Sequence, residues 1–351
     1  MPEKKKQHYV PKFYLRFFGN HEKDTHIGLY NIPSRKFITE AAISSQAYEN
    51  FFYGKDSEIE NALGTIEDQA AKVLKEVIEK KEIPKYKSEE YTTLWLFILL
   101  QGTRTRNAAK ETNDMLDLTI KHLFKDHPSL DGIDMSNYRI ELEDPVLLNL
   151  QTSLKSFVVA QDLKCKLIIN ESKLPFITSD HPVVRYNQFL EKRMYPDGKI
   201  GLASKGLQIF CPISPRLSII LYDARVYKIG YKKQSAITTV KEINIHQLNL
   251  LQVLNCGENI YFNDKMSEYQ INNLIEKSEK YIGGIEPRVN EYFGETKKDG
   301  SSSSIVKTSG PHIEIKLNLS FIKETDHSKQ YKFSSYAIQL RDEKYRNINI
   351  D

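Results

Sequence analysis

The chain has 351 residues, of which 40% are hydrophobic and 27% charged, and its formal net charge is +4. This composition is typical of a globular protein with one large or two modest domains, and so small a net charge is weak evidence for nucleic-acid binding. A strongly apolar run, Leu94–Leu100, is too short for a membrane helix, which needs about twenty residues. Lys4–Lys6 precede polar-interrupted aromatic sequence instead of an apolar signal stretch, so we expect a cytoplasmic protein without membrane contact.

The number and spacing of the cysteines, and the absence of several known motifs, argue against several classes of site and enzyme. Cys165, Cys211 and Cys256 are odd in number and widely spaced, which argues against a disulfide framework and against zinc-finger spacing. The sequence also lacks the P-loop, the glycine-rich dinucleotide fingerprint, the Gly-x-Ser-x-Gly elbow and the His-Glu-x-x-His helix. We therefore expect neither a nucleotide cofactor nor a redox cofactor.

The chain begins with an aromatic block, Gln7–Phe18, which contains five aromatic rings together with His8 and Arg16. Chain termini are normally polar and frayed, whereas each buried aromatic ring removes roughly 150–250 Å² from water. We therefore expect the block to be part of the core. The rings expected to be buried are Phe13, Tyr14 and Phe17.

Helical spacing follows a hairpin that we expect over residues 27–39. From Ile59 to Val77 apolar residues recur every three or four positions, which predicts a helix that Ser57 caps and that ends near Ile83. The apolar run Leu94–Leu100 predicts a buried central helix. Further helix is expected over about residues 88–124, 144–159, 240–254 and 267–282.

Alternating apolar residues from Lys164 onward predict strands, over about residues 164–169, 175–178, 207–212 and 216–223. The predicted fold is α+β, with a helical layer from about 57 to 160 packed on a mixed, mostly antiparallel sheet within about 164–260. We expect residues 1–296 to form this main domain.

The C-terminal part is expected to be a serine-rich linker, 297–310, followed by a β-hairpin segment, 311–351. Apolar residues alternate strictly from Ile313 to Phe321, which predicts a strand with one face in water. Because an isolated hairpin is marginal in water, the strand must dock on a larger body. We favour docking within the same chain, with a homo-oligomer through this strand as the alternative.

Several motifs resemble a bacterial family of uncharacterised function. The block from His8 to Arg16 is similar to the His-Tyr-Val-Pro-x-Phe-Tyr-Leu-Arg start of its members, and Phe176–Val183 is similar to their Thr-Ser-Asp-x-Pro-Val turn. Glu49–Tyr53, the helix bearing Glu67 and Pro212–Pro215 also look like that family, so the resemblance spans about residues 7–260. Members often carry Asn where this chain has His181, which argues against a catalytic role for His181. The family context implies a role in bacterial defence or toxin-type conflict.

Candidate catalytic residues are His8, Glu67 and Asp180, which are also the candidate ligands of a divalent metal ion, Mg²⁺ or Mn²⁺. Candidate substrate-binding residues are Arg16, Arg104 and Arg106, since guanidinium groups bind phosphate in a fork-like manner. Each has a structural interpretation as well. Asp180 can cap its own turn, and Arg104 or Arg106 can pair with Glu67 or Asp180.

Two functions are therefore open. In the first, imidazole, carboxylates and guanidinium groups converge in a metal-dependent phosphodiester hydrolase of the nuclease type, acting on nucleic acid or a nucleotide. In the second, the protein is a non-catalytic effector or interaction module, the aromatic block closes the helical core and the arginines are paired with acids. Convergence of the candidate residues in one cleft would distinguish the two.

Overall fold

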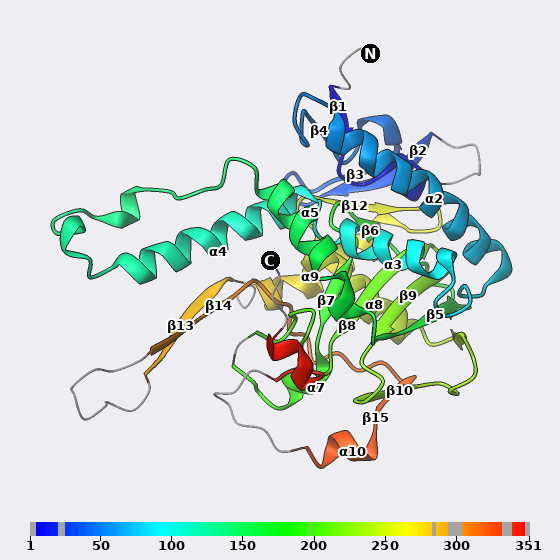
Figure 1. The fold of residues 1–351 in the computed structure, drawn as a ribbon. Helices are drawn as coiled ribbons and strands as arrows, with labels where there is room; N and C mark the ends of the chain where they lie inside the picture. The colour runs from blue at the N-terminus through cyan, green and yellow to red at the C-terminus, as the bar shows by residue number, and fades with distance from the viewer. Residues whose placement is uncertain are drawn as a thin grey trace.

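Two β-sheets lie at the centre of the computed structural model, and helices cover both faces of the larger one (Figure 1). The structure describes residues 5–19, 25–196, 198–282, 286–293, 304–331 and 339–347. The fold is α+β, as predicted, because most strand pairs are antiparallel and helices do not alternate regularly with strands. Within these ranges, no helix has both the length and the apolar composition that crossing a membrane requires.

The helices confirm the segments predicted from apolar spacing. The expected cap at Ser57 is wrong, because Ser57 adopts a left-handed backbone conformation with φ of 60° and its side chain makes no capping bond. Ser88 does cap its helix, where its Oγ accepts from the Tyr91 N–H at 3.2 Å. The α-helices are α1 (Lys12–Arg16), α2 (Glu58–Lys80), α3 (Glu89–Gln101), α4 (Arg106–Phe124), α5 (Pro145–Lys155), α6 (Phe157–Ala160), α7 (Gln188–Lys192), α8 (Glu242–Asn255), α9 (Glu268–Ile282) and α10 (Asp326–Lys329). Short 3₁₀ turns occupy Ile43–Ser45, Pro128–Leu130, Met135–Asn137 and Glu343–Asn347.

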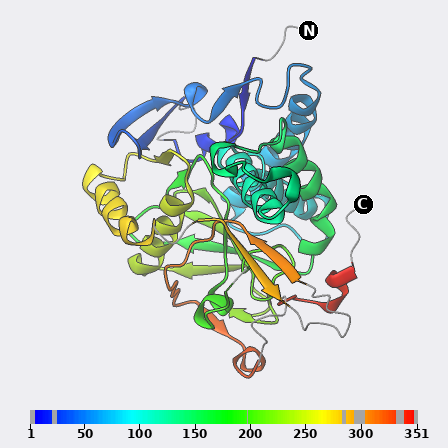
Figure 2. The same cartoon turned by 90° about the vertical axis from the view of Figure 1, so that its left-hand side faces the viewer.

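The larger sheet contains β5 (Lys164–Asn170), β7 (Val184–Tyr186), β8 (Gln208–Ser214), β9 (Leu217–Tyr222) and β11 (Ala236–Thr239). Their order is β11-β5-β9-β8-β7, with β11 parallel to β5 and the other pairs antiparallel. Every residue of β8 and β9 is buried, because successive side chains enter cores on opposite faces. Ile219 belongs to the core under α2 and α3, whereas Ile220 belongs to the core under α8 and α9. Figure 2 shows these helix pairs on opposite sides of the sheet.

The smaller sheet joins segments that are far apart in the sequence. It contains β2 (His26–Asn31), β3 (Lys36–Ala42), β6 (Thr178–Ser179) and β12 (Asn259–Phe262), in the order β3-β2-β12-β6. All of its pairs are antiparallel, and β2 and β3 form the predicted hairpin. Gly28 faces Phe262, whose ring would lie 2.4 Å from a Cβ at that position. Glycine there lets β2 and β12 approach closely.

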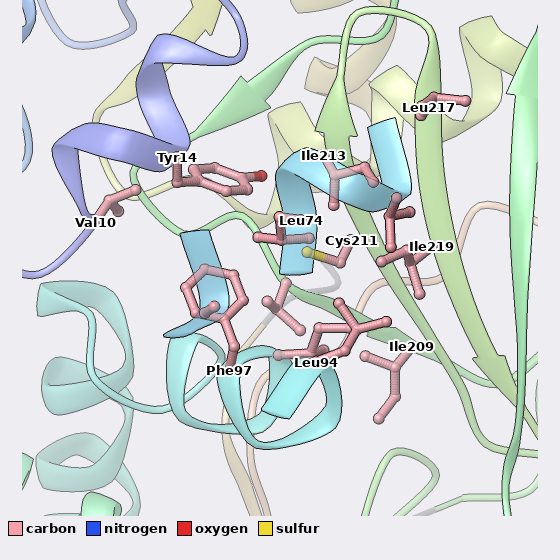
Figure 3. Packing of buried hydrophobic residues seen from close by; sticks show 14 of the residues in the cluster. Val10, Tyr14, Leu74, Leu94, Phe97, Ile209, Cys211, Ile213, Leu217 and Ile219 are labelled. Carbon is pink, nitrogen blue, oxygen red and sulfur yellow. The ribbon is translucent and has the colours of Figure 1, made fainter. Parts of the chain in front are cut away.

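The N-terminal block is part of the core, as predicted. β1 (Lys6–His8) pairs with β4 (Tyr48–Asn50), and α1 follows directly. Tyr14 is fully buried, and Phe13 and Phe17 are half-buried against the same cluster. Figure 3 shows Val10 and Tyr14 beside side chains of α2, α3 and β8. The Tyr14 hydroxyl lies 2.9 Å from the Oγ1 of Thr178 and donates to the carbonyl of Pro212.

A C-terminal hairpin is present, but it lies earlier in the chain than predicted. β13 (Arg288–Phe293) pairs with β14 (Ser304–Ser309), so residues 304–309 form a strand where a linker was expected. The linker was expected because of the serine run, whereas residues such as Ile305, which pairs with Tyr292, extend the strand into that range. Residues 297–303 of the expected linker lie outside the described ranges.

The segment from Ile313 to Phe321 is extended and docks within the same chain, but it is not a β-strand. Ile313, Ile315, Leu317 and Leu319 are buried in the core under α8 and α9. Side chains replace a strand partner: the Tyr186 hydroxyl accepts from the backbone N–H groups of Ile315 at 3.1 Å and of Leu317 at 3.2 Å. Alternation predicts burial of one face, but cannot tell a strand partner from such side-chain acceptors.

The chain then returns to the main body in two further contacts. β15 (Ile322–Glu324) pairs with β10 (Tyr227–Ile229). Arg341, whose side chain is 1% exposed, lies against Asp162, with N–O distances of 2.8 and 2.9 Å. Its guanidinium also donates to the backbone carbonyls of Val159, Leu202 and Ser204. All of these N–H donors have acceptors, so the contact of Arg341 with the main body anchors the C-terminal segment.

We expect Arg341→Met to lower the free energy of unfolding by about 3–5 kcal/mol, because it leaves a half-buried carboxylate and several carbonyls without a donor. Arg225→Met is the matched control. Arg225 also contacts this segment, but its side chain is 57% exposed, so the expected loss is below about 1 kcal/mol. Urea unfolding measures both. Equal effects would contradict the anchoring role of Arg341.

Candidate functional site

Glu67 and Arg104 form an ion pair with each other in the core between α2 and α3. The Arg104 Nη1 lies 2.8 Å from the Glu67 Oε1, and the Arg104 side chain is only 2% exposed. Its Nε and Nη2 both donate to the Oε1 of Gln101, at 3.0 and 2.8 Å. Gln101 in turn donates to the carbonyl of Tyr9. The pairing matches the structural interpretation, since these groups bond each other and the N-terminal block.

The other two candidate arginines lie at the surface. Arg106 is 61% exposed and lies 3.5 Å from the Oε1 of Glu258 and 3.9 Å from the Oε2 of Glu49. Arg16 is exposed in the last turn of α1. Exposed ion pairs of this kind contribute little to stability. Neither side chain lines the cleft that is described below.

His8 lies in β1 with its ring half-buried against Tyr48, at 5.6 Å between ring centroids. Its Nε2 is buried and has no hydrogen-bond partner among the described residues. Burial, followed by the charge of Lys12, lowers the pKa of His8 to about 4. The ring is therefore neutral near pH 7 and enclosed in the N-terminal block.

Asp180 fixes a loop by accepting three backbone hydrogen bonds. Its Oδ1 accepts from the N–H of Gly257 at 2.8 Å, and its Oδ2 accepts from Glu258 at 2.8 Å and Asn259 at 2.9 Å. The residue is 5% exposed, and burial raises its pKa although the three N–H donors act in the opposite direction. The turn after β6 is thereby held against the turn between α8 and β12.

The structure does not bring the candidate metal ligands together. No group of three His, Cys, Asp or Glu side chains arranged to hold a metal ion occurs in the ranges that the structure describes. Glu67 is engaged by Arg104 and Asp180 by backbone N–H groups, so His8, Glu67 and Asp180 do not offer the free donor set that a divalent ion requires.

A cleft of about 930 Å³ opens beside Asp180, and it contains other polar side chains. Its walls come from the start of α4, from α5, from the ends of α8 and α9, from the chain between β6 and β7, and from residues 311–313. Such a volume suits a small-molecule or nucleotide-sized ligand. None of His8, Glu67, Asp180, Arg16, Arg104 and Arg106 lines it, whereas His181 does.

Three ionisable side chains in the cleft have perturbed pKa values. Burial raises the pKa of Glu111 to about 7, although Arg185 and Lys110 act in the opposite direction. Burial lowers the pKa of His181 to about 4, with the charge of Arg185 as the second cause. Burial also lowers the pKa of Arg185, and Glu111 opposes this shift. Clustered perturbation in a cleft is a recognised mark of a functional site.

Arg185 is half-buried in β7, and no described residue forms a hydrogen bond or ion pair with its guanidinium. Glu111 acts on Arg185 through its charge without forming an ion pair with it, and its Oε1 accepts from the Nδ2 of Asn107 at 2.8 Å. A guanidinium has five N–H donors, so a half-buried one without a partner is poised for an anion.

The sequence analysis missed Glu111 and Arg185, although signals for both exist. Asn107, Glu111 and Asp114 recur at helical spacing along α4, so that their polar side chains share one face of the helix. Arg185 follows the turn 180–183 at the middle of a short strand whose neighbours, Val184 and Tyr186, are apolar. A charged residue between two residues of this kind, directly after a turn, is a pattern that indicates a site.

Comparison with known proteins gives one match. The family described as "Protein of unknown function (DUF4238)" matches residues 6–266. The chain matches no curated protein and no solved structure. Glu111, His181 and Arg185 lie inside the matched range, whereas the cleft residues of α9 and of 311–313 lie beyond it.

We expect Glu111→Gln to stabilise the protein relative to wild type as pH rises. The pKa of Glu111 is about 7 when folded against 4.5 as its ordinary value, so its contribution is fully present below pH 4.5 and is lost as pH rises through 7. Glutamine keeps the acceptor for Asn107 and does not ionise. The gain at pH 8 over pH 5 is at most about 3 kcal/mol. Thermal melts at both pH values measure it, with Glu79→Gln, exposed on α2, as the control. A gain that is the same at both pH values would contradict burial of the Glu111 carboxyl.

We expect Asp180→Asn to lower the free energy of unfolding by about 3 kcal/mol, because an amide N–H₂ would face a buried backbone donor. Asp131→Asn, at an exposed position, should have no measurable effect. Melting with EDTA, Mg²⁺ or Mn²⁺ should leave this difference unchanged. If Mg²⁺ or Mn²⁺ stabilises the wild type and not the variant, Asp180 is a metal ligand after all.

Proposed function

The chain belongs to the DUF4238 family, whose function is unknown, and we propose that it hydrolyses phosphodiester bonds in the cleft. The side chains that line the cleft are the basis of this proposal. We keep the reaction class expected from the sequence, and move the chemistry from His8, Glu67 and Asp180 to Glu111 and Arg185. The observation that carries this proposal is the half-buried, unpartnered guanidinium of Arg185 facing the cleft in the described part of the chain.

The charge balance of the cleft favours a ligand with a single negative charge. The other two cations that line it are paired, Arg35 with Glu279 at 2.9 Å and Lys110 with Asp114 at 2.8 Å. Arg185 thus supplies the unpaired positive charge in the described lining, and the exposed carboxylate of Glu286 disfavours a dianion. A phosphodiester carries one negative charge and two oxygens that a guanidinium can bind together.

Glu111 provides the proton transfer that hydrolysis requires. With its pKa near 7, it is present in both protonation states at neutral pH, which suits a general base and acid. The carboxylate removes a proton from water as the water oxygen bonds to phosphorus. The phosphorus–oxygen bond to the leaving alcohol then breaks, and the same proton passes to that alcohol. Dependence on Mg²⁺ or Mn²⁺ stays a prediction, as do a nucleic-acid substrate and a role in bacterial defence or toxin-type conflict.

Hydrolysis of bis(4-nitrophenyl) phosphate tests the proposal, with the monoester 4-nitrophenyl phosphate as the comparison substrate. We expect the wild type to prefer the diester, and Arg185→Met to reduce kcat/KM by about 100-fold or more, because an oxyanion donor is lost. Arg288→Met, at an exposed position of β13, is the matched control and should not change the rate. Reactions are run with EDTA, Mg²⁺ and Mn²⁺. Absence of diester hydrolysis in all three, or an Arg185→Met enzyme as fast as wild type, would reject the assignment.

A non-catalytic interaction module is the second candidate, and one set of observations favours it. The motif residues have structural partners: Arg104 binds Glu67, Asp180 binds backbone N–H groups and Arg106 lies beside acids. That is what an interaction module was expected to show. The same assay separates the candidates, since a module should hydrolyse neither ester under any condition.

A further inference from the structure

Thr105 and His181 form a buried hydrogen bond at the inner end of the cleft. Thr105 caps α4, is 0% exposed, and its Oγ1 accepts from the N–H of Ala108 at 3.2 Å. The same Oγ1 lies 2.5 Å from the Nδ1 of His181. The cleft wall therefore contains an imidazole whose inner nitrogen faces a hydroxyl group.

The position of the hydroxyl proton determines the tautomer of His181. Thr105 has one O–H to donate, and the Nδ1 of His181 is its one acceptor among the described residues. If Nδ1 carried a proton instead, the buried hydroxyl proton of Thr105 would have no acceptor, which buried donors rarely tolerate. The hydroxyl therefore donates to Nδ1, and the neutral ring carries its own proton on Nε2.

The Nε2 of His181 opens into the cleft. His181 lines the cleft, and no described residue bonds its Nε2. The buried polar side-chain atoms without partners in the described chain are the Nε2 of His8, the Nε1 of Trp95 and the hydroxyl of Tyr261, so the Nε2 of His181 is not enclosed. Burial and the charge of Arg185 lower the pKa of His181 to about 4, so the ring stays neutral at pH 7.

We propose that His181 is a fixed, neutral hydrogen-bond donor, which binds the same phosphate group as Arg185, and that Thr105 is the positioning residue that keeps its proton on Nε2. The proposal rests on the anion-binding cleft of the proposed function. In this site Glu111 transfers the proton and Arg185 supplies the positive charge. His181 supplies an uncharged N–H to the phosphate oxygen that gains negative charge as water attacks.

Long-range ¹H–¹⁵N spectra of the full chain labelled with ¹⁵N-histidine test the tautomer directly. The His181 signals are identified by their absence from His181→Gln. At pH 7 we expect an unprotonated Nδ1 and a protonated Nε2, and we expect the ring to remain neutral down to about pH 5. A proton on Nδ1, or a doubly protonated ring at pH 7, would overturn the inference. This readout requires no catalysis, so it can fail while diester hydrolysis stands.

Variants of Thr105 test its positioning role by the same readout. Thr105→Ser keeps the hydroxyl and should give the wild-type tautomer. Thr105→Asp keeps a cap acceptor but has no proton to give, so it should move the His181 proton from Nε2 to Nδ1. If the Asp variant is folded by circular dichroism and keeps Nε2 protonated, Thr105 does not set the tautomer. If it does not fold, the wild-type spectrum still tests the role of Thr105, because a proton on Nδ1 there would mean that the Thr105 hydroxyl does not donate to the ring.

Titration with dimethyl phosphate, a diester monoanion, tests the shared ligand. Added to wild-type protein in which both histidine and arginine carry ¹⁵N, dimethyl phosphate should shift the Nε2 signal of His181 and the guanidinium signals of Arg185 with one apparent Kd. Shifts at Arg185 alone would overturn the role of His181 and leave the anion site intact. Shifts at neither residue would overturn both that role and the proposed function.

Discussion

The buried carboxylate of Asp180 is the constraint on which the site depends. Its three backbone hydrogen bonds join the chain after β6 to the turn between α8 and β12, two segments that are far apart in sequence. These hydrogen bonds also hold His181 and Arg185, which follow Asp180 in the chain, at the cleft. A carboxylate that accepts three backbone hydrogen bonds contributes geometry, because few of its lone pairs remain for a metal ion.

Much of the fold was predictable because it follows from local patterns. Apolar spacing locates α2, α3 and α9, and alternation locates β5, β8 and β9. What failed depends on partners outside the pattern. Ser57 has the right residue type for a cap, but its left-handed backbone prevents it, and Ile313–Phe321 alternates like a strand while side chains such as Tyr186 supply its hydrogen-bond acceptors. The hairpin β13–β14 was misplaced because its serine-rich part suggested a linker.

The site was less predictable, because the tertiary structure, and not a local sequence pattern, determines which side chains meet in one cleft. The resemblance correctly identified the family, and led to motif residues that prove to be structurally engaged: Arg104 with Glu67, and Asp180 with the backbone. The side chains in the cleft are neighbours of those motifs. His181 follows Asp180 and Arg185 lies four residues beyond it, while Thr105, which is buried behind His181, follows Arg104. A motif can thus be specific because it builds the support for a site, so the residues beside it deserve equal weight in a sequence analysis.

Docking of residues 313–319 into the core under α8 and α9 has a consequence for the order of folding during synthesis. One face of the large sheet is covered by α2 and α3, which precede its strands in the chain, whereas the core on the opposite face is completed by α8, α9 and residues 313–319, which follow them. Exposed sheet surface of this kind favours aggregation, so a nascent chain would depend on chaperones at that stage. His312 and Ile313, at the start of this segment, line the cleft, so the cleft wall is completed only once they have docked. A chain in which residues 311–319 have not yet docked would therefore lack part of the cleft wall.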